Sequence, residues 1–303
     1  MKILLTGGAG FIGSHVFDKL NPSNEILILD NLSKGRKSNL KSAYNLIEID
    51  INDKKTGDII SDFNPNIIIH TAAQTSVSNS LEKPETDVKD NILASINILN
   101  NINQDLEHFI FFSSGGAIYG DQIEFPATED HPIQPISPYG ISKRYIELYL
   151  EYLSKVKNLN YTSLRLSNVY GPRQRSDMEG GVIAIFIENL IKNIEPKIYG
   201  NGEQTRDFIY VEDIAKAVES IINKKVYGTY NLSSNKEISI NSLKEIVLNE
   251  LNSNLNFKHL NQRSGEVLRS YLSSKKAFEA FSWKAKTELK EGILKTINYF
   301  QNQ

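Results

Sequence analysis

The chain has 303 residues, of which 40% are hydrophobic, with a formal net charge of −2 and no cysteine. This length supports a large core, and the missing cysteines exclude disulfides and thiol catalysis. The charge balance offers no basic excess for nucleic acid or an anionic membrane. Five scattered histidines lack metal-ligand spacing, and no stretch approaches the ~20 apolar residues of a membrane span, so we expect a cytoplasmic protein without a metal.

Short, nearly continuous apolar runs alternate with helical stretches through the first two-thirds of the chain. Such runs are typical of parallel strands that are covered on both faces. The predicted strands are Lys2–Thr6, Glu25–Leu29, Leu46–Ile49, Ile67–His70, His108–Phe112 and Tyr161–Leu166, with helices around Ile12–Leu20, Ile92–Ile102 and Pro138–Val156. The repeated β–α units predict an α/β fold with a doubly wound parallel Rossmann sheet.

The pattern loosens after Tyr170, where a polar loop is expected at Gly171–Gly181. The later elements are a helix near Val182–Lys192, a strand at Phe208–Val211, a helix to Asn223, a strand at Thr229–Leu232, and helices near Ile240–Leu251 and Thr287–Gln301. Both later strands are expected to return to the sheet. We therefore predict a Rossmann domain over residues 1–170, with a return segment at about 207–233. A smaller α/β substrate domain is predicted over 171–206 and 234–303.

A glycine-rich loop, Gly8-x-Gly10-x-x-Gly13, follows the first predicted strand and opens a helix. Glycines let the backbone approach a pyrophosphate, and the helix N-terminus presents free N–H groups to it. Asp30 ends the second strand, where a carboxylate can bind both ribose hydroxyls and would repel a 2′-phosphate. This favours NAD over NADP, although Arg36 lies close enough in sequence to accept such a phosphate. The alternative interpretation is an ordinary glycine turn.

Tyr139 and Lys143 stand four residues apart on a predicted helix, so their side chains share a face. A phenol is a poor base at neutral pH, and a nearby ammonium is expected to lower its pKa. Tyr271 and Lys275 have the same spacing, so spacing alone does not decide between the pairs. Tyr139 follows a sheet strand, where ligands bind in open α/β folds, and is the predicted acid and base.

Many further motifs occur in order along nearly the whole chain. They are Thr6–His15 (TGGAGFIGSH), Asp30–Leu32, Asp50–Ile51, His70–Ser80 (HTAAQTSVSNS), Asn91, Ser113–Gly120 (SSGGAIYG), Ser137–Lys143 (SPYGISK), Asn168–Arg173 (NVYGPR), Gly200–Asp213 (GNGEQTRDFIYVED) and Arg263–Arg269 (RSGEVLR). Together they resemble the extended short-chain dehydrogenase/reductase family, and within it the UDP-sugar 4-epimerases. The resemblance implies bound NAD, a nucleotide-sugar substrate and a homodimer.

The resemblance also implies roles for individual residues. The implied cofactor contacts are Gly7, Gly10, Phe11, Ile12, Gly13, Asp30, Asn31, Asp50, Ile51, Thr71, Ala72, Ala73, Asn91, Ser113, Tyr139 and Lys143. The implied substrate contacts are Ser114, Asn168, Val182, Tyr199, Arg206, Arg263, Glu266 and Ser270. Among them, the two arginines would clamp the diphosphate, because a guanidinium matches its geometry.

The sequence departs from the family at one catalytic position. The family usually places a Ser or Thr four residues before the tyrosine of the Tyr-Gly pair, and Gly115 stands there. Ser114 is the nearest hydroxyl, so we expect it to bind the reacting sugar O4. The segment Gly115–Ala117 also lacks the Thr-Asp-Glu run of related 4,6-dehydratases and the Glu of related decarboxylases. Epimerisation at C4, through a 4-keto sugar, is the reaction that this pattern favours.

The sugar itself stays open. Ser270 falls where related epimerases carry a residue beside the sugar, and a small side chain there leaves room for a 2-N-acetyl group. UDP-GlcNAc and UDP-GalNAc are therefore expected beside UDP-Glc and UDP-Gal. The alternatives are a uronate 4-epimerase, with Arg173 or Arg175 as the cation near C6, or another nucleotide-sugar oxidoreductase. A non-catalytic NAD-binding sensor is the more distant alternative, because fold does not imply function.

Overall fold

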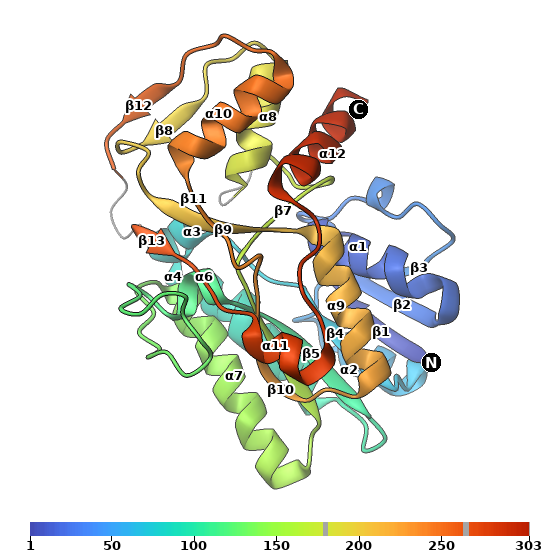
Figure 1. Ribbon diagram of the computed structural model, residues 1–303. Helices are drawn as coiled ribbons and strands as arrows, with labels where there is room; N and C mark the ends of the chain where they lie inside the picture. Colours follow the sequence, from blue (N-terminus) through green and yellow to red (C-terminus); the bar gives the residue numbers. More distant parts are fainter. Residues whose placement is uncertain (178–180, 263–266, 303) are drawn as a thin grey trace.

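A computed structural model describes residues 1–177, 181–262 and 267–302. Its main element is a sheet of seven parallel strands in the order β10-β6-β5-β4-β1-β2-β3 (Figure 1). These strands are β1 (Lys2–Thr6), β2 (Glu25–Asp30), β3 (Asn45–Glu48), β4 (Ile67–His70), β5 (His108–Ser114), β6 (Tyr161–Leu166) and β10 (Gly228–Leu232). The predicted α/β class and parallel sheet are confirmed.

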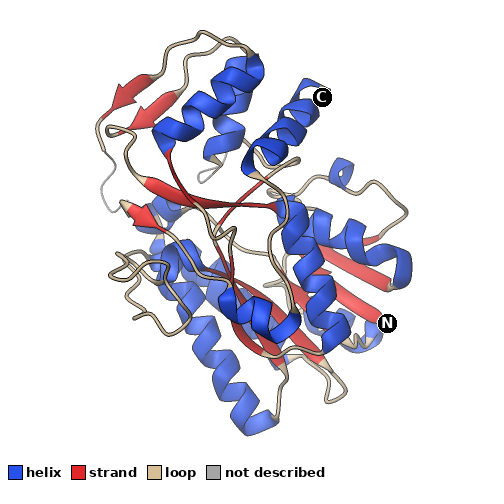
Figure 2. Cartoon of the chain, in the orientation of Figure 1, coloured by secondary structure: helices blue, strands red, loops and turns tan. Residues whose placement is uncertain are grey.

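Helices cover both faces of this sheet (Figure 2). They are α1 (Phe11–Leu20), α2 (Lys55–Phe63), α3 (Val77–Glu82), α4 (Pro84–Asp87), α5 (Ala94–Asn100), α6 (Gly115–Ile118), α7 (Pro138–Lys157), α9 (Val211–Lys224) and α11 (Lys275–Phe281). Shorter turns are the 3-10 helices η1 (Asn21–Ser23) and η2 (Lys37–Asn39) and the π-helix η3 (Val88–Leu93). The helix expected at Ile92–Ile102 therefore begins earlier, with a π turn.

The core has two layers because neighbouring strand residues point to opposite faces. Ile3 and Leu5 of β1 pack into one apolar cluster with α1, α9 and α11. Leu4, between them, packs into the other cluster with α2, α5 and α7. The continuous apolar run that predicted β1 thus reflects burial on both faces.

A smaller part, built from segments before α9 and after β10 in the chain, lies above the main sheet in Figure 1. Strand β9 (Thr205–Tyr210) pairs with β7 (Asn168–Tyr170), β11 (Glu237–Ser239) and β13 (Arg269–Ser270), and β8 (Lys197–Tyr199) pairs with β12 (Lys258–Leu260). Helices α8 (Val182–Ile191), α10 (Ile240–Leu251) and α12 (Leu289–Gln301) share a third apolar cluster with these strands.

The expectation that the strand at Phe208–Val211 returns to the main sheet is wrong. This segment ends β9, whose neighbours are β7, β11 and β13. A short apolar run can pair with any available strand edge, so the sequence could not tell which sheet would take it. The strand predicted at Thr229–Leu232 does join the main sheet, because β10 pairs with β6.

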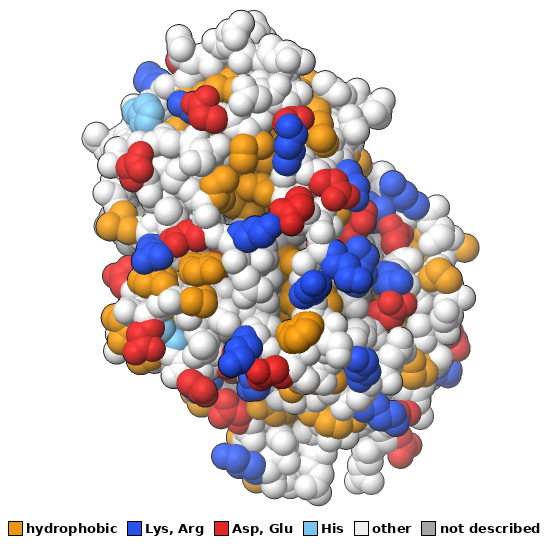
Figure 3. Space-filling model, viewed as in Figure 1, with side chains coloured by type: hydrophobic (Ala, Val, Ile, Leu, Met, Phe, Trp, Pro, Cys, Tyr) orange, Lys and Arg blue, Asp and Glu red, His pale blue; other side chains and the backbone are white. Residues whose placement is uncertain are grey.

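Charges of both signs are interspersed over the face of the molecule seen in Figure 3, in keeping with the small net charge. Among the described residues, no helix combines the length and the apolar character that a bilayer span requires.

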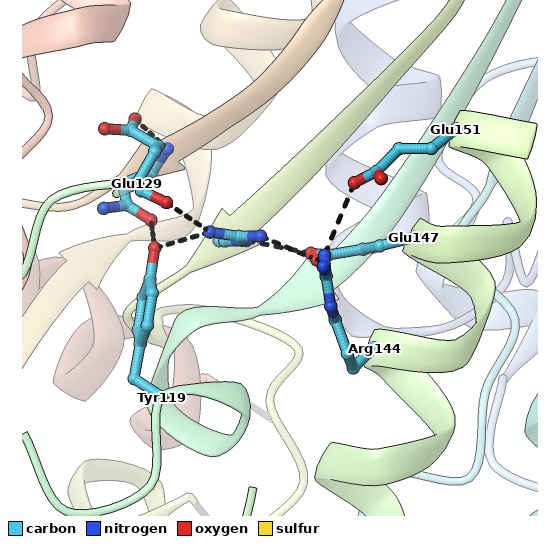
Figure 4. Close-up of polar contacts among 7 residues, drawn as sticks. Tyr119, Glu129, Arg144, Glu147 and Glu151 are labelled. Carbon is cyan, nitrogen blue, oxygen red and sulfur yellow. Dashed lines mark hydrogen bonds and ion pairs between the residues drawn. The ribbon is translucent and has the colours of Figure 1, made fainter. Parts of the chain in front are cut away.

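A buried ion pair fastens α7 to the main sheet (Figure 4). The Arg165 guanidinium on β6 donates to both carboxylate oxygens of Glu147 on α7, at 3.0 and 2.8 Å. The same guanidinium donates to the Tyr119 hydroxyl at 2.9 Å and to the Glu129 carbonyl at 3.2 Å. Tyr119 in turn donates to Asn231 on β10 at 2.7 Å. One cation therefore ties together two strands, a loop and the longest helix.

We expect Glu147→Ala to destabilise the fold strongly. It would leave the Arg165 guanidinium, which is 3% exposed, buried without its carboxylate partner. The cost of breaking such a pair is about 3–5 kcal/mol in the free energy of unfolding, measurable by urea titration. The control is Glu291→Ala, which removes a solvent-exposed pair with Lys295 and should change that free energy by less than about 0.5 kcal/mol. Equal effects of the two variants would contradict the structural role of Glu147.

Candidate active site

The glycine-rich loop joins β1 to α1 through a tightly packed turn. Gly7 has φ +71°, a conformation that residues with a side chain rarely adopt, and its position lies against the backbone of Ala72. A Cβ on Gly13 would overlap the Gly7 carbonyl oxygen. Gly10 precedes the first turn of α1, which contains no acidic residue. The helix N-terminus therefore stays open to an anion, and these features fit the pyrophosphate of a dinucleotide.

Three polar residues predicted to hold the adenosine end lie together beyond β2 and β3. Asp30 is buried, and its carboxylate accepts the Ala9 and Leu32 N–H groups at 2.9 and 2.8 Å. Burial raises the pKa of Asp30, and the two backbone hydrogen bonds oppose that shift. Asn31 donates to Asp50 at 3.2 Å. The Arg36 side chain is exposed.

The loop after β4 lies against the glycine turn. Thr71 donates to the Thr6 carbonyl at 2.6 Å, which fixes the first of the three loop residues predicted to line the cofactor cleft. Asn91 is buried and exchanges two hydrogen bonds, both 3.0 Å, with the backbone of Gln74. Asn91 therefore supports the loop through its backbone. The neighbouring predicted contacts Ala72 and Ala73 are half-buried, and Ile51 is buried.

Tyr139, Lys143 and Ser114 converge at the carboxyl end of β5. Ser137 caps α7 by accepting the Gly140 N–H at 3.1 Å, which places Tyr139 in the first turn of that helix. The Tyr139 phenol shares a hydrogen bond with the Ser114 side chain. The Lys143 ammonium donates to the Phe112 carbonyl at 2.9 Å and lies 5.8 Å from the centre of the Tyr139 ring. The structure thus assembles the three side chains that the sequence singled out.

The expected effect of Lys143 on the pKa of Tyr139 is wrong. Burial raises the pKa of Tyr139 to about 12, the hydrogen bond from Ser114 opposes this shift, and the charge of Asp87 adds to it. Burial also lowers the pKa of Lys143 to about 8, against the charges of Asp87 and Glu147. The reason is geometric, because the ammonium hydrogen bond goes to a strand carbonyl and not to the phenol.

Ser113 is the predicted cofactor contact next to Ser114. Its hydroxyl is buried and has no hydrogen-bond partner within the described part of the chain.

The competing pair, Tyr271 and Lys275, has separate partners. Tyr271 donates to the Asn235 carbonyl at 3.1 Å, and Lys275 forms an exposed pair with Glu279. Tyr271 and Lys275 are therefore engaged separately, which agrees with their predicted structural role.

Apart from Ser114 on β5, the described residues predicted to contact substrate lie in the smaller part of the chain. Asn168 begins β7, Ser270 on β13 is in register with Arg206 on β9, and Arg206 donates to the Thr205 carbonyl at 2.8 Å. Val182 begins α8, and Tyr199 ends β8. Arg263 and Glu266 lie outside the described residues. Since β9 pairs with both β7 and β13, the small sheet brings Asn168, Arg206 and Ser270 onto neighbouring strands.

Leu272 explains the missing hydroxyl at Gly115. A Cβ on Gly115 would overlap the Cδ1 atom of Leu272, which is fully buried beside Ile118 and Tyr119. A Ser or Thr at this position would therefore have to displace a core side chain. Gly116 faces more open space, with the Asn168 Oδ1 atom 3.9 Å from the position of an added Cβ. Sequence analysis could not identify Leu272 as the neighbour of Gly115, because the two residues lie more than 150 positions apart in the chain.

The two arginines considered for a uronate substrate have other partners. Arg173 is buried and donates to Asp18 on α1 at 2.5 Å. Arg175 donates to Asp177 at 2.8 Å and to the Lys34 carbonyl at 3.3 Å. Neither side chain has a hydrogen bond to Ser114, Tyr139 or Lys143 in the described part of the chain.

Comparisons with known proteins agree with this geometry. The NAD dependent epimerase/dehydratase family matches residues 3–233. A Methanocaldococcus jannaschii protein, provisionally named a UDP-glucose 4-epimerase, is 44% identical over 99% of this chain and 98% of its own. The Thermotoga maritima UDP-glucose 4-epimerase, solved with UDP-glucose, superimposes with a TM-score of 0.95 at 38% identity, covering 100% of this chain and 99% of that one.

A second similar structure is named for an N-acetylated sugar. It is the UDP-N-acetylglucosamine 4-epimerase of Methanobrevibacter ruminantium, solved with UDP-N-acetylmuramic acid. Its TM-score is 0.94 at 34% identity, and the match covers 99% of this chain and 98% of that one.

We expect Gly115→Ser to destabilise the fold without restoring a useful hydroxyl. The new side chain would meet Leu272 in a filled core, and such overpacking typically costs about 1–3 kcal/mol in the free energy of unfolding. The matched control is Gly116→Ser, one residue away, where the space is open. Urea unfolding of both variants is the measurement. If Gly115→Ser were as stable as Gly116→Ser, Leu272 would not be what excludes a side chain at position 115.

Proposed function

Because the chain belongs to the NAD dependent epimerase/dehydratase family, we propose that it interconverts C4 epimers of a UDP-sugar with NAD as its cofactor. The observation that carries this proposal is the convergence of Ser114, Tyr139 and Lys143 at the carboxyl end of β5. The part built on the seven-stranded sheet would bind NAD, through the glycine turn and Asp30. The smaller part would bind the UDP-sugar. Asn168, Arg206 and Arg263 would contact the diphosphate, and Val182, Tyr199 and Glu266 would surround the uridine.

The proposed mechanism assigns one task to each catalytic side chain. NAD, when bound, supplies reversible hydride transfer at the sugar C4. Tyr139 must first lose its own proton, against the raised pKa that burial gives it; the phenolate then takes the proton of the sugar O4 during oxidation and returns it during reduction. Ser114, which is hydrogen-bonded to Tyr139, steadies the same oxygen. Lys143 places a positive charge beneath the tyrosine, and Arg206 holds the diphosphate while the 4-keto sugar turns to present its other face.

The absence of other acids and bases supports epimerisation over elimination. Gly115, Gly116 and Ala117 follow Ser114 directly, so that turn carries no carboxylate. The bonds of Arg173 to Asp18 and of Arg175 to Asp177 give no support to a uronate substrate. A sensor without catalysis would need no buried ammonium beside a tyrosine, because a buried charge is costly to maintain.

The sugar ring is proposed to carry either a hydroxyl or an N-acetyl group at C2. Ser270, on β13 beside Arg206, is a small side chain at the place predicted to face the sugar. The similarity to the M. ruminantium UDP-N-acetylglucosamine 4-epimerase supports a site with room for the larger group. We place the enzyme in the cytoplasm, because NAD and UDP-sugars are made and kept there.

We expect the purified protein to convert UDP-galactose and UDP-GalNAc to their gluco epimers, followed by proton NMR of the anomeric signals. Tyr139→Phe should lower turnover at least ~100-fold, because it removes the acid and base, while NAD affinity stays unchanged. The wild-type ratio of the two rates tests the role of Ser270, since a closed pocket would favour UDP-galactose strongly. No conversion of either sugar, even with added NAD, would contradict the epimerase proposal.

We also propose that the protein forms a homodimer through α7. Ile141, Tyr145, Leu148, Tyr152 and Val156 are 42–55% exposed and recur at helical spacing along this helix. The family resemblance also implies the helix near Ile92–Ile102 for the interface, but Leu99 on it is buried in the core and is unavailable to a partner. The exposed residues near it are Val88 and Leu93, on η3. A continuous exposed apolar stripe of this kind is typical of a protein interface.

Leu148→Glu should convert the dimer to a monomer, because it places a charge in the middle of the apolar stripe. Light scattering coupled to gel filtration measures the mass directly. Lys157→Glu is the control, since it changes charge at the exposed end of the same helix, on the side away from the stripe, and should leave the dimer intact. A wild-type protein that is already monomeric at micromolar concentration would contradict the proposed interface.

A further inference from the structure

Asp87 is a fully buried carboxylate that the roles assigned so far do not explain. It ends α4 and has no solvent-exposed surface. Its oxygens accept the Gln74 Nε2 group at 3.0 Å, the Asn91 Nδ2 group at 2.8 Å and the Ser142 hydroxyl at 2.6 Å. Asp87 thus joins three elements of the site: the loop after β4, the helix turn that supports this loop, and α7 at the residue before Lys143.

The charge of Asp87 is not cancelled by a neighbouring cation. All three hydrogen-bond donors are neutral, and within residues 1–177, 181–262 and 267–302 no lysine or arginine forms an ion pair with it. A buried carboxylate without a counter-ion costs free energy unless hydrogen bonds satisfy it, and the three donors do so here. The charge of Asp87 acts to raise the pKa of both Tyr139 and Lys143.

The other charged and titratable groups around Lys143 contribute less net charge. Glu147, on the same helix, also favours the ammonium, but its carboxylate is neutralised by Arg165 and Arg144 (Figure 4). His70 on β4 is fully buried between Thr6 and Ser95, and burial together with the charge of Lys143 lowers its pKa to about 3, so it is neutral.

From strand β5, Lys143 contacts the Phe112 carbonyl and the Phe111 ring, and neither group is charged. Tyr139, the remaining titratable neighbour, holds its proton at neutral pH because burial raises its pKa to about 12. Asp87 is therefore the one uncompensated negative charge acting on Lys143 among the described residues.

We propose that Asp87 is a positioning residue that keeps Lys143 protonated and holds it in place. Its charge stabilises the buried ammonium, and its hydrogen bond to Ser142 fixes the turn of α7 that carries Lys143. The same carboxylate holds Gln74 and Asn91, so the loop predicted to line the cofactor cleft is tied to the catalytic helix through one side chain. The catalytic consequence rests on the proposed epimerase function; the effect on the charge of Lys143 does not.

Removing the charge of Asp87 should shift the pH dependence of activity to lower pH. The alkaline limb of the rate profile follows loss of the Lys143 proton. The charge of Asp87 acts to raise the pKa of Lys143, so its removal lowers that pKa. The alkaline limb should therefore shift to lower pH, whereas a residue that only supports the fold would lower activity without moving this limb.

The experiment measures kcat/KM against pH for the NAD-loaded enzyme and Asp87→Asn, with UDP-galactose as substrate. We expect the alkaline limb to shift to lower pH by about one pH unit, at the low end of the effect of a nearby charge. Glu85→Gln makes the same charge change on the exposed side of α4 and should leave the profile in place. Ser142→Ala removes the hydrogen bond and keeps the charge, so it should lower kcat without shifting the limbs.

A second measurement needs no turnover. In protein labelled at the lysine Cε with ¹³C, the Lys143 signal is assigned by its loss in Lys143→Met and titrated with pH. Its midpoint should fall in Asp87→Asn, and in Asp87→Ser should the first variant not fold. An unchanged midpoint overturns the proposal whether or not the protein is an epimerase. A lowered midpoint without any UDP-sugar turnover would keep the role of Asp87 and refute the proposed function alone.

Discussion

The ammonium group of Lys143 is buried, with only 5% of the residue exposed to solvent, and much of the site is arranged around that charge. The Phe112 carbonyl takes its hydrogen bond, the rings of Phe111 and Tyr139 lie beside it, and Asp87 supplies the opposing charge. Burial disfavours the charged form, so the ammonium persists only because the strand, the helix and the carboxylate are held together around it. The orientation of α7 is thus a requirement of the chemistry as well as of the fold.

The Arg165–Glu147 pair holds α7 in this orientation, one helical turn beyond Lys143. Its two short hydrogen bonds fix the helix against β6, while Arg165 also reaches Tyr119 and the loop at Glu129. Because Arg165 cancels the charge of Glu147, the pair anchors the helix without adding a large field at Lys143. The two buried carboxylates near Lys143 therefore have different roles. Glu147 holds α7 against the sheet, and Asp87 is proposed to stabilise the charge of the Lys143 ammonium.

The glycine turn also depends on close packing, in this case between backbone segments. Gly13 lies against the Gly7 carbonyl and Gly7 against Ala72, so the first strand, the first helix and the loop after β4 meet without intervening side chains. That contact brings the predicted cofactor residues to the carboxyl ends of neighbouring parallel strands, close to Ser114 and Tyr139. The position of the site follows from the parallel sheet, because every strand in it delivers its carboxyl end to the same edge.

The sequence by itself determined the α/β class, most strands of the main sheet, the glycine turn and the grouping of Tyr139, Lys143 and Ser114. These features follow from local spacing and from the apolar runs that double-sided burial requires. Only the tertiary structure decided that β9 joins a separate sheet, that Leu272 fills the space beside Gly115, and that burial raises the pKa of Tyr139. It also placed the buried Asp87 carboxylate beside the part of α7 that carries Lys143. Each of these depends on contacts between residues far apart in the chain, which spacing along the sequence does not encode.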